Sequence, residues 1–212
     1  MPKIKGIFFD MDGVLIDARE WHYEALNQAL RLFSFEVERY DHLVTYDGLP
    51  TKKKLEMLSL EKGLPRALHP FINKLKQEYT FELIQSRCKP SFNHRFALSS
   101  LSREGYVLGV CSNSIKKTVI TMLERANILN YFKINLSNEE VTNPKPHPEI
   151  YNKAIELARL EPKQCLILED NQHGIAAAEA SGSHVMHIGT PDDVTYENIH
   201  SHIQIIEQGD RR

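Results

Sequence analysis

The sequence predicts an α/β fold, a doubly wound, Rossmann-like parallel sheet joined to a second, smaller, all-helical domain. Two observations lead to this prediction. Short apolar runs rich in β-branched residues alternate with helical patterns through the second half of the chain, which is typical of βαβ units. One long segment, residues 17–89, interrupts this alternation and contains only helical patterns. With 212 residues, 42% of them hydrophobic, the chain is long enough to bury such a core.

The first predicted strand is the run GIFF at residues 6–9, which stops abruptly at Asp10 and is soon followed by Asp12 and Gly13. Burying unpaired charge is costly, so the two carboxylates need a compensating group, and a metal ion is the obvious candidate. A calcium loop also combines alternate carboxylates with a glycine. Here the third ligand position is Val14 and the last position is not acidic, which excludes a calcium loop.

The inserted segment reads as helices separated by turns. Apolar residues between Trp21 and Phe33 recur at helical spacing, and the stretches 51–62 and 67–86 each follow a Gly-Leu-Pro turn. The run TKKK at the start of the second stretch fits a solvated helix start. We therefore predict two domains, a core of residues 1–16 and 90–212 and a helical domain of residues 17–89.

The rest of the chain supplies the other elements of the sheet. The predicted strands are 106–111, 132–136, 165–169, 184–189 and 203–207. The predicted helices are 115–126 after a Ser-Asn-Ser cap, 148–158 beginning at a proline, and 174–181 ending at Gly182. Parallel strands place a binding site at their carboxyl ends.

One of these strand ends and one loop add polar residues. Ser112 and Asn113 follow the second strand just before a helix, where a hydroxyl and free backbone N–H groups can bind an anion. Asn113 or Ser114 can also simply cap that helix. Lys145 lies between two prolines, which stiffen the loop and restrict where its ammonium group can point.

The run CLILE repeats the pattern of the first strand, because it ends in the acids Glu169 and Asp170 just before a helix. Two acidic strand ends side by side would form an oxygen-rich pocket suited to Mg²⁺. For Glu169, stabilisation of the helix N-terminus is an equally good explanation.

Composition narrows the class of protein. The formal net charge of −2 gives no electrostatic footprint for nucleic acid or an anionic membrane. Cys111 and Cys165 lie inside apolar runs, as small core residues in a reducing cytoplasm do. No run has the length of a transmembrane span, and the beginning of the chain lacks a signal-peptide pattern. We expect a soluble, cytoplasmic monomer that binds neither nucleic acid nor membrane.

The extended motifs FFDMDGVLID, VCSNS, NPKPHP and EDNQHGIAAAEASG occur in this order. The chain thereby resembles the haloacid dehalogenase superfamily of phosphotransferases, over roughly residues 4 to 190. It is most similar to the subgroup with a helical cap between the first two motifs, which includes β-phosphoglucomutase-like and phosphoglycolate-phosphatase-like enzymes.

This resemblance implies roles for the motif residues. Asp10 would attack phosphorus and become an aspartyl-phosphate, and Asp12 would protonate the leaving oxygen and then activate water. Mg²⁺ would be held by Asp10, the backbone carbonyl of Asp12, Asp170 and, in an assisting role, Glu169. Ser112 and Lys145 would bind the transferring phosphoryl group, with Asn113 and Gly13 beside it. Phosphoryl transfer depends on such charge compensation more than on covalent help.

The helical cap would close over the site, exclude water and select the leaving group, with hinges near residues 14–19 and 87–92. His22 matches a histidine that steers the general acid in β-phosphoglucomutase-like sequences, although it also fits an ordinary surface histidine. Thr51 and Lys52, in a loop similar to the substrate-specificity loop of the subgroup, are candidates to face the substrate.

The sequence therefore predicts a Mg²⁺-dependent phosphatase for a small phosphorylated metabolite such as a sugar phosphate. A β-phosphoglucomutase-like mutase is the alternative, although Thr51 stands where mutases carry a basic residue. Dehalogenation fits less well, since it requires neither Mg²⁺ nor the second aspartate. A catalytically silent binding protein is disfavoured by the intact acids and lysine. A receiver-type signalling domain would not need the helical insertion.

Overall fold

The structure, a computed structural model, describes residues 3–209. The chain forms two compact units. One comprises the residues up to Asp17 and those from Lys89 onward, and we call it the α/β unit; the other, Ala18–Cys88, we call the helical unit. No helix within residues 3–209 has both the length and the apolar character that a membrane span requires.

The α/β unit is built on a five-stranded sheet in which every strand pair is parallel. The strand order is β3-β2-β1-β4-β5. The strands are β1 (Gly6–Phe9), β2 (Val107–Cys111), β3 (Ile134–Leu136), β4 (Cys165–Glu169) and β5 (His184–His187). β1 and β4 are buried along their whole length, as expected for continuous apolar runs in the middle of a parallel sheet.

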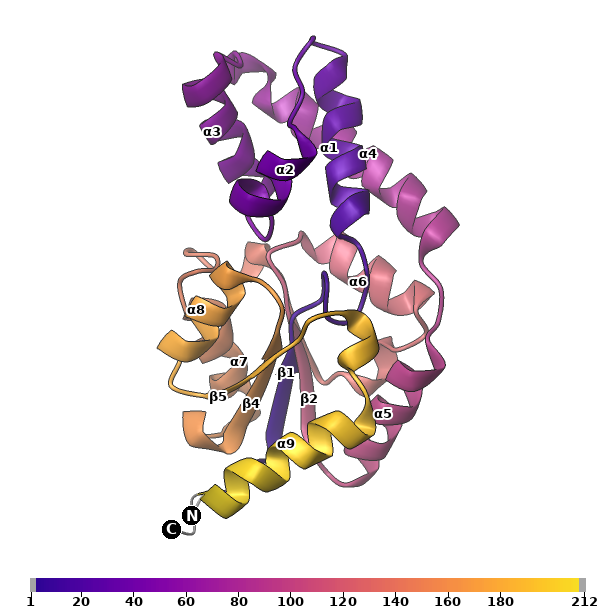
Figure 1. The fold of residues 1–212 in the computed structure, drawn as a ribbon, viewed down its shortest axis with the longest axis vertical. Helices are drawn as coiled ribbons and strands as arrows, with labels where there is room; N and C mark the ends of the chain where they lie inside the picture. The colour runs from indigo at the N-terminus through magenta and orange to yellow at the C-terminus, as the bar shows by residue number, and fades with distance from the viewer. Residues whose placement is uncertain (1–2, 210–212) are drawn as a thin grey trace. The chain divides into compact units, whose positions relative to one another are not determined.

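Helices cover both faces of this sheet, so the predicted doubly wound α/β class is confirmed (Figure 1). The helices of this unit are α5 (Phe92–Arg103), α6 (Lys116–Arg125), α7 (Glu149–Ala158), α8 (Gln172–Ala180) and α9 (Tyr196–Gly209). On one face, α7 and α8 pack on side chains of the sheet that include Phe8 and Ile167. α5 contacts β2 and α9 on the other side.

Short 3₁₀ turns connect several of these elements. They are η3 (Leu129–Tyr131), η4 (Asn138–Glu140), η5 (Pro162–Gln164) and η6 (Pro191–Asp193). Cys111 and Cys165 are buried free thiols, which confirms the prediction that both are core residues. Burial raises the pKa of each to about 12, so both stay protonated.

The prediction of a sixth strand at residues 203–207 is wrong, because these residues lie inside α9. The buried residues of that helix are Ile199 and Ile203, four residues apart and therefore on one helical face. Ile205 is 66% exposed. A run as short as IQIIE fits both the two-residue period of a strand and the 3.6-residue period of a helix. Ile199, one helical turn before Ile203, shows that the helical period is the correct one.

Two further expectations about the helices need correction. α5 was not predicted; its start is capped by Ser91, whose side chain accepts a hydrogen bond from the backbone of His94. The predicted side-chain cap of α6 by Asn113 or Ser114 is wrong. Its N-cap residue is Ile115, and no side-chain cap bond forms there.

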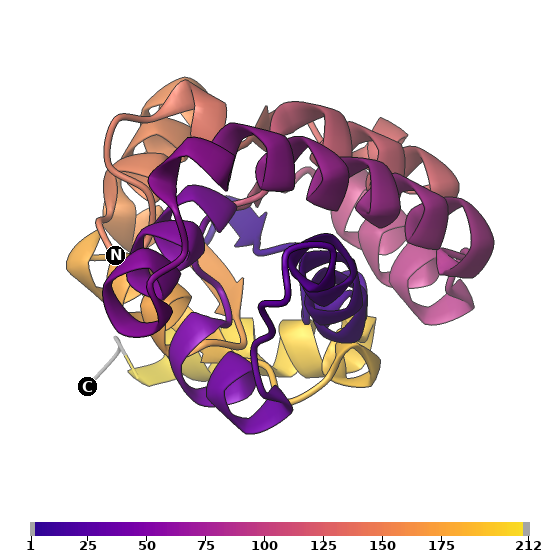
Figure 2. The ribbon, with the colours of Figure 1, turned by 90° about the horizontal axis from the view of Figure 1, so that it is seen from above.

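The helical unit has no strand, and the structure describes all of its residues, 18–88. It contains α1 (Arg19–Arg31), α2 (Arg39–Asp41), a π-helical turn η1 (His42–Tyr46), α3 (Thr51–Lys62), a 3₁₀ turn η2 (Arg66–Leu68) and α4 (His69–Arg87). Figure 2 shows these helices from above. α1 packs against α4, and a hydrophobic cluster of buried side chains joins both to α3. Gly63 ends α3 in the left-handed conformation, at φ +71°.

Candidate active site

The acids predicted to form the site meet at the carboxyl ends of β1 and β4. The two strands pair in parallel up to Phe9 and Leu168, so the next residues, Asp10 and Glu169, are neighbours. The pairing continues beyond the strand, since the backbone N–H of Asp10 donates to the carbonyl of Leu168 at 3.0 Å. One oxygen each from Asp10, Glu169 and Asp170 lie within 4.8 Å of one another.

Lys145 reaches this acidic group from its loop and is almost completely buried. Its Nζ donates to Asp10 Oδ1 at 2.7 Å, to Glu169 Oε1 at 2.6 Å and to the carbonyl of Cys111 at 2.8 Å. The three protons of the ammonium group therefore have three acceptors. Burial by itself would lower the pKa of Lys145, but the carboxylates of Asp10 and Glu169 outweigh it and raise that pKa above its ordinary value.

The charge at Asp10 is not fully balanced by this lysine. Burial raises the pKa of Asp10 well above its ordinary value, and the neighbouring Glu169, Asp170 and Asp12 raise it further, while Lys145 opposes them. An ionised Asp10 would therefore be stabilised by further positive charge. The donors are hard carboxylate oxygens, the ligand type that Mg²⁺ prefers. The cluster of Asp10, Glu169 and Asp170 thus fits a divalent cation.

Glu169 is fully buried and has donors on both of its oxygens. Oε1 accepts from Lys145 and from the hydroxyl of Tyr151. Oε2 accepts from the backbone N–H of Asp170 at 3.2 Å and from Asn171 Nδ2 at 3.4 Å. Asn171 also caps α8 by accepting from the N–H of Gly174 at 2.9 Å. The carboxylate of Glu169 therefore lies against the start of α8 and at the same time contacts the lysine.

Asp12 lies in a tight loop after β1. Gly13 has φ +91°, a conformation that favours glycine, and its N–H donates to the carbonyl of Ile16 at 2.7 Å. The hydroxyl of Ser114 donates to Asp12 Oδ2 at 3.0 Å. Ser114 thus connects the end of β2 to the second aspartate, a contact that was not predicted.

Ser112 and Asn113 lie at the end of β2, as predicted. Ser112 is buried, and its hydroxyl oxygen accepts from the backbone N–H of Ser114 at 3.1 Å. The Asn113 side chain bonds both backbone groups of Lys145, donating to its carbonyl at 3.3 Å and accepting from its N–H at 3.1 Å. Asn113 therefore holds the loop that presents the lysine; its predicted contact with a phosphoryl group stays a prediction.

The other predicted residues belong to the helical unit. His22, on α1, is buried, and its Nδ1 lies 3.1 Å from Nζ of Lys76 on α4, so it is not an ordinary surface histidine. Thr51 is half-buried and Lys52 is exposed at the start of α3. The prediction of a solvated helix start at TKKK is wrong for Lys54, which is buried.

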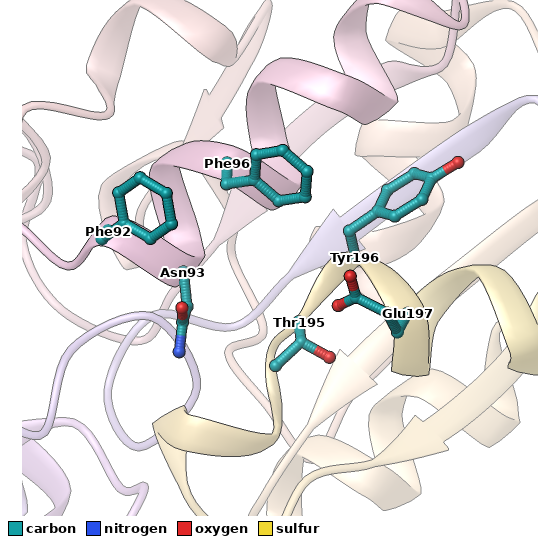
Figure 3. Close-up of a pocket in the computed structure, with 6 residues that line it drawn as sticks. All are labelled: Phe92, Asn93, Phe96, Thr195, Tyr196 and Glu197. Carbon is teal, nitrogen blue, oxygen red and sulfur yellow. The ribbon is translucent and has the colours of Figure 1, made fainter.

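A separate pocket of about 220 Å³ lies between α5 and α9 (Figure 3). Its lining consists of Phe92, Asn93, Phe96, Thr195, Tyr196 and Glu197. The rings of Phe92 and Phe96 stack at 6.2 Å, and Tyr196 meets Phe96 edge-on at 6.1 Å. None of the residues predicted for the active site lines this pocket.

Sequence reasoning missed Tyr151, which is fully buried on α7. Its ring lies 4.8 Å from Nζ of Lys145, and burial raises the pKa of its hydroxyl well above the ordinary value. One signal was present in the sequence. Tyr151 falls at helical spacing with the apolar residues Ala154 and Ile155, and a hydroxyl on a buried helix face implies a buried partner.

Known proteins are similar to this chain over most of its length. Residues 7–188 match the family described as haloacid dehalogenase-like hydrolase. A phosphorylated carbohydrates phosphatase of Thermotoga maritima is 25% identical over 185 residues, covering 84% of this chain and 82% of its own. A pyrophosphatase of Bacillus cereus is 24% identical over 192 residues, covering 85% of this chain and 81% of its own.

The fold is also found among solved structures. A β-phosphoglucomutase from Clostridium difficile has a TM-score of 0.83 at 19% identity, covering 95% of this chain and 97% of its own. The resemblance inferred from the four motifs is therefore confirmed. This chain belongs to the haloacid dehalogenase-like hydrolase family.

Proposed function

We propose that the protein is a Mg²⁺-dependent phosphatase that hydrolyses a small phosphorylated metabolite, a sugar phosphate, through an aspartyl-phosphate on Asp10. The observation that carries the proposal is the direct bond from Lys145 Nζ to Asp10 Oδ1 inside a cluster of three acids. A cation-assisted carboxylate is suited to attack on phosphorus. The relatives named as phosphatases of phosphorylated carbohydrates and of pyrophosphate support the same reaction type.

In this proposal Asp10, Asp170 and the backbone carbonyl of Asp12 would hold Mg²⁺, assisted by Glu169. When bound, Mg²⁺ supplies the positive charge that offsets repulsion between a carboxylate and a phosphate dianion. Lys145 and Ser112 bind oxygens of the phosphoryl group, with Asn113 and Gly13 beside them. Because all three protons of Lys145 already have acceptors, it contacts a phosphoryl oxygen by exchanging one of these bonds.

In the first half-reaction a carboxylate oxygen of Asp10 attacks phosphorus, and the bond from phosphorus to the leaving oxygen breaks. Asp12 gives its proton to that oxygen, so that a neutral alcohol departs. The products of this step are the aspartyl-phosphate, the alcohol and the carboxylate form of Asp12. Ser114, which donates to Asp12 Oδ2, orients the proton donor.

In the second half-reaction water attacks phosphorus, and the carboxylate of Asp12 takes its proton. The bond between phosphorus and the Asp10 oxygen breaks, which releases phosphate and regenerates both aspartates in their starting forms. The two carboxylates thereby divide the work, one as nucleophile and one as acid and base. We further propose that the helical unit selects the substrate, through His22, Thr51 and Lys52.

The test is a screen of the purified protein against phosphorylated metabolites with Mg²⁺ present, including glucose phosphates and pyrophosphate. Free phosphate and isomer interconversion are followed in parallel. We expect phosphate release from at least one sugar phosphate without interconversion. Interconversion without net phosphate release would favour the mutase alternative, and absence of both would contradict the proposal.

A further inference from the structure

We propose that Tyr151 is a positioning residue of this site, which fixes Lys145 both through Glu169 and through direct contact with its ring. The inference rests on the proposed function, since it concerns the lysine that would bind the phosphoryl group. Tyr151 would touch neither the substrate nor the metal. It would act through the two side chains that it contacts.

The first observation is a shared acceptor. Glu169 Oε1 accepts both from Lys145 Nζ, at 2.6 Å, and from the hydroxyl of Tyr151. All three side chains are buried, so water does not replace a missing donor there. The hydroxyl of Tyr151 therefore restricts the orientation of the Glu169 carboxylate. Because Lys145 donates to the same oxygen, this orientation also restricts the position of the ammonium group.

The second observation concerns the ring. Lys145 Nζ lies 4.8 Å from the centroid of the Tyr151 ring, within the range of a cation–π contact. The ammonium group thus has three acceptors and an aromatic face around it. Tyr151 contributes to two of these four contacts, one of them directly and one through Glu169.

An ordinary core role competes with this inference, because Tyr151 also packs among the apolar residues of α7 and the sheet. The two roles depend on different parts of the Tyr151 side chain. Packing depends on the ring alone, whereas positioning through Glu169 depends on the hydroxyl. Tyr151→Phe removes only the hydroxyl, and Tyr151→Leu removes the ring as well.

The chain provides a matched control in Tyr196, whose hydroxyl also donates to a carboxylate, that of Glu104, on the exposed surface. Tyr196→Phe therefore removes a similar hydrogen bond outside the site. Wild type and the three variants are compared in kcat and KM for p-nitrophenyl phosphate and in thermal midpoint. We expect a fall in kcat of about 10-fold for Tyr151→Phe, with KM changed less than about twofold, and a larger fall for Tyr151→Leu.

A double-mutant cycle separates positioning from packing. If the hydroxyl acts through Glu169, Tyr151→Phe has little further effect on kcat in a Glu169→Gln background. Crystal structures of wild type and Tyr151→Phe give a readout independent of activity. We expect the Lys145 ammonium group of the variant to leave hydrogen-bond distance of Asp10 Oδ1.

Wild-type kcat in Tyr151→Phe together with an unmoved Lys145 would overturn the inference. So would equal losses in Tyr151→Phe and Tyr196→Phe, or a loss in Tyr151→Phe that is unchanged in the Glu169→Gln background. Failure of the proposed function is distinguishable from these results, because wild type would then release no phosphate. The crystal structures would still decide the role of Tyr151.

Discussion

The carboxylate of Glu169 occupies the space that a side chain at Gly174 would need. A β-carbon built on Gly174 would lie 1.9 Å from Glu169 Oε1, far inside van der Waals contact. Glu169 ends β4, and Gly174 belongs to the first turn of α8. A glycine in this helix therefore allows a buried carboxylate to reach Lys145.

Gly174→Ala is expected to lower both activity and stability. Glycine-to-alanine changes in helices usually stabilise by about 0.5–1 kcal/mol. Here the added methyl group displaces Glu169, so we expect the free energy of unfolding to fall by about 1–3 kcal/mol. The contacts of Lys145 are then disturbed, and kcat falls by about 10-fold or more.

Gly209→Ala is the matched control, since Gly209 also lies in a helix, α9, and a β-carbon there would meet nothing within 4 Å. Urea unfolding and phosphate release measure the two effects. Similar behaviour of the two alanine variants would refute the close packing between Gly174 and Glu169.

Ser114→Ala tests the contact with the second aspartate. The Ser114 hydroxyl donates to Asp12 Oδ2 at 3.0 Å, and its loss leaves the proton donor less well oriented. We expect kcat to fall by about 10-fold for an alkyl phosphate, the equivalent of one hydrogen bond. A p-nitrophenyl leaving group needs little protonation, so its hydrolysis should change less.

Ser86→Ala serves as the control for this prediction, because the Ser86 hydroxyl bonds only backbone carbonyls of its own helix, α4. It should leave hydrolysis of both substrates unchanged. An equal effect of Ser114→Ala on both leaving groups would argue against a role in proton donation.

Mg²⁺ should stabilise the folded protein through the acidic cluster. A ligand at 100 times its Kd stabilises by about 2.7 kcal/mol, so we expect a higher thermal midpoint with Mg²⁺ and loss of hydrolysis with EDTA, restored by Mg²⁺. In Asp170→Asn the Mg²⁺-dependent shift should disappear. Without metal this variant should be more stable than wild type, since Asp170 repels the buried Asp10.

Asp192→Asn, which changes an acid in the η6 turn, is the control and should keep the Mg²⁺ effect of wild type. The thermal midpoint is measured with and without Mg²⁺ for all three proteins. A shift of equal size in Asp170→Asn and wild type would place the bound cation elsewhere.

His42 should make the stability of the helical unit depend on pH. Burial, followed by Lys54, His22 and Lys76, lowers the pKa of His42 to about 3 from its ordinary 6.5. Between these values the unfolded chain takes up a proton and the folded chain does not. Stability is therefore complete above pH 6.5 and falls as the pH drops toward 3, by at most about 1.4 kcal/mol per pH unit.

His42→Phe keeps a ring beside Tyr23, whose ring lies 5.2 Å away, but removes the titratable nitrogens. Its stability should fall less steeply over the same pH range. The single tryptophan, Trp21, lies on α1, so its fluorescence during urea unfolding reports on this unit. Parallel slopes for wild type and variant would show that His42 is not the responsible group.

The fold was predictable where local patterns are long or end in turn residues. β1 and β4, which are followed by Asp10 and Asp170, were located because their apolar runs stop abruptly at acids. The sheet was predicted from the alternation of strand and helix patterns. The prediction for residues 203–207 was wrong because their apolar residues fit the period of a strand as well as that of a helix. Packing against the rest of the unit selects the helix.

The sequence predicted which acids and which lysine the candidate site contains, but not the hydrogen bonds among its side chains. Four short motifs indicated Asp10, Lys145, Glu169 and Asp170. The acids were found because unpaired charge at buried strand ends requires an explanation, and the lysine because prolines flank it. The partners Tyr151 and Ser114 come from other positions in the chain, and their contacts depend on three-dimensional packing. The burial of Lys54 could not be predicted either, because a run of three lysines is typical of an exposed surface.

Isolation of the covalent intermediate is the most direct measurement of the central claim. Wild type and Asp10→Asn are mixed with a substrate identified in the screen, quenched in acid within one turnover, and digested for mass spectrometry. The account predicts one phosphoryl group on the peptide that contains Asp10 in wild type, and neither label nor turnover in Asp10→Asn. A phosphoryl group on another residue, or turnover that persists in Asp10→Asn, would contradict it.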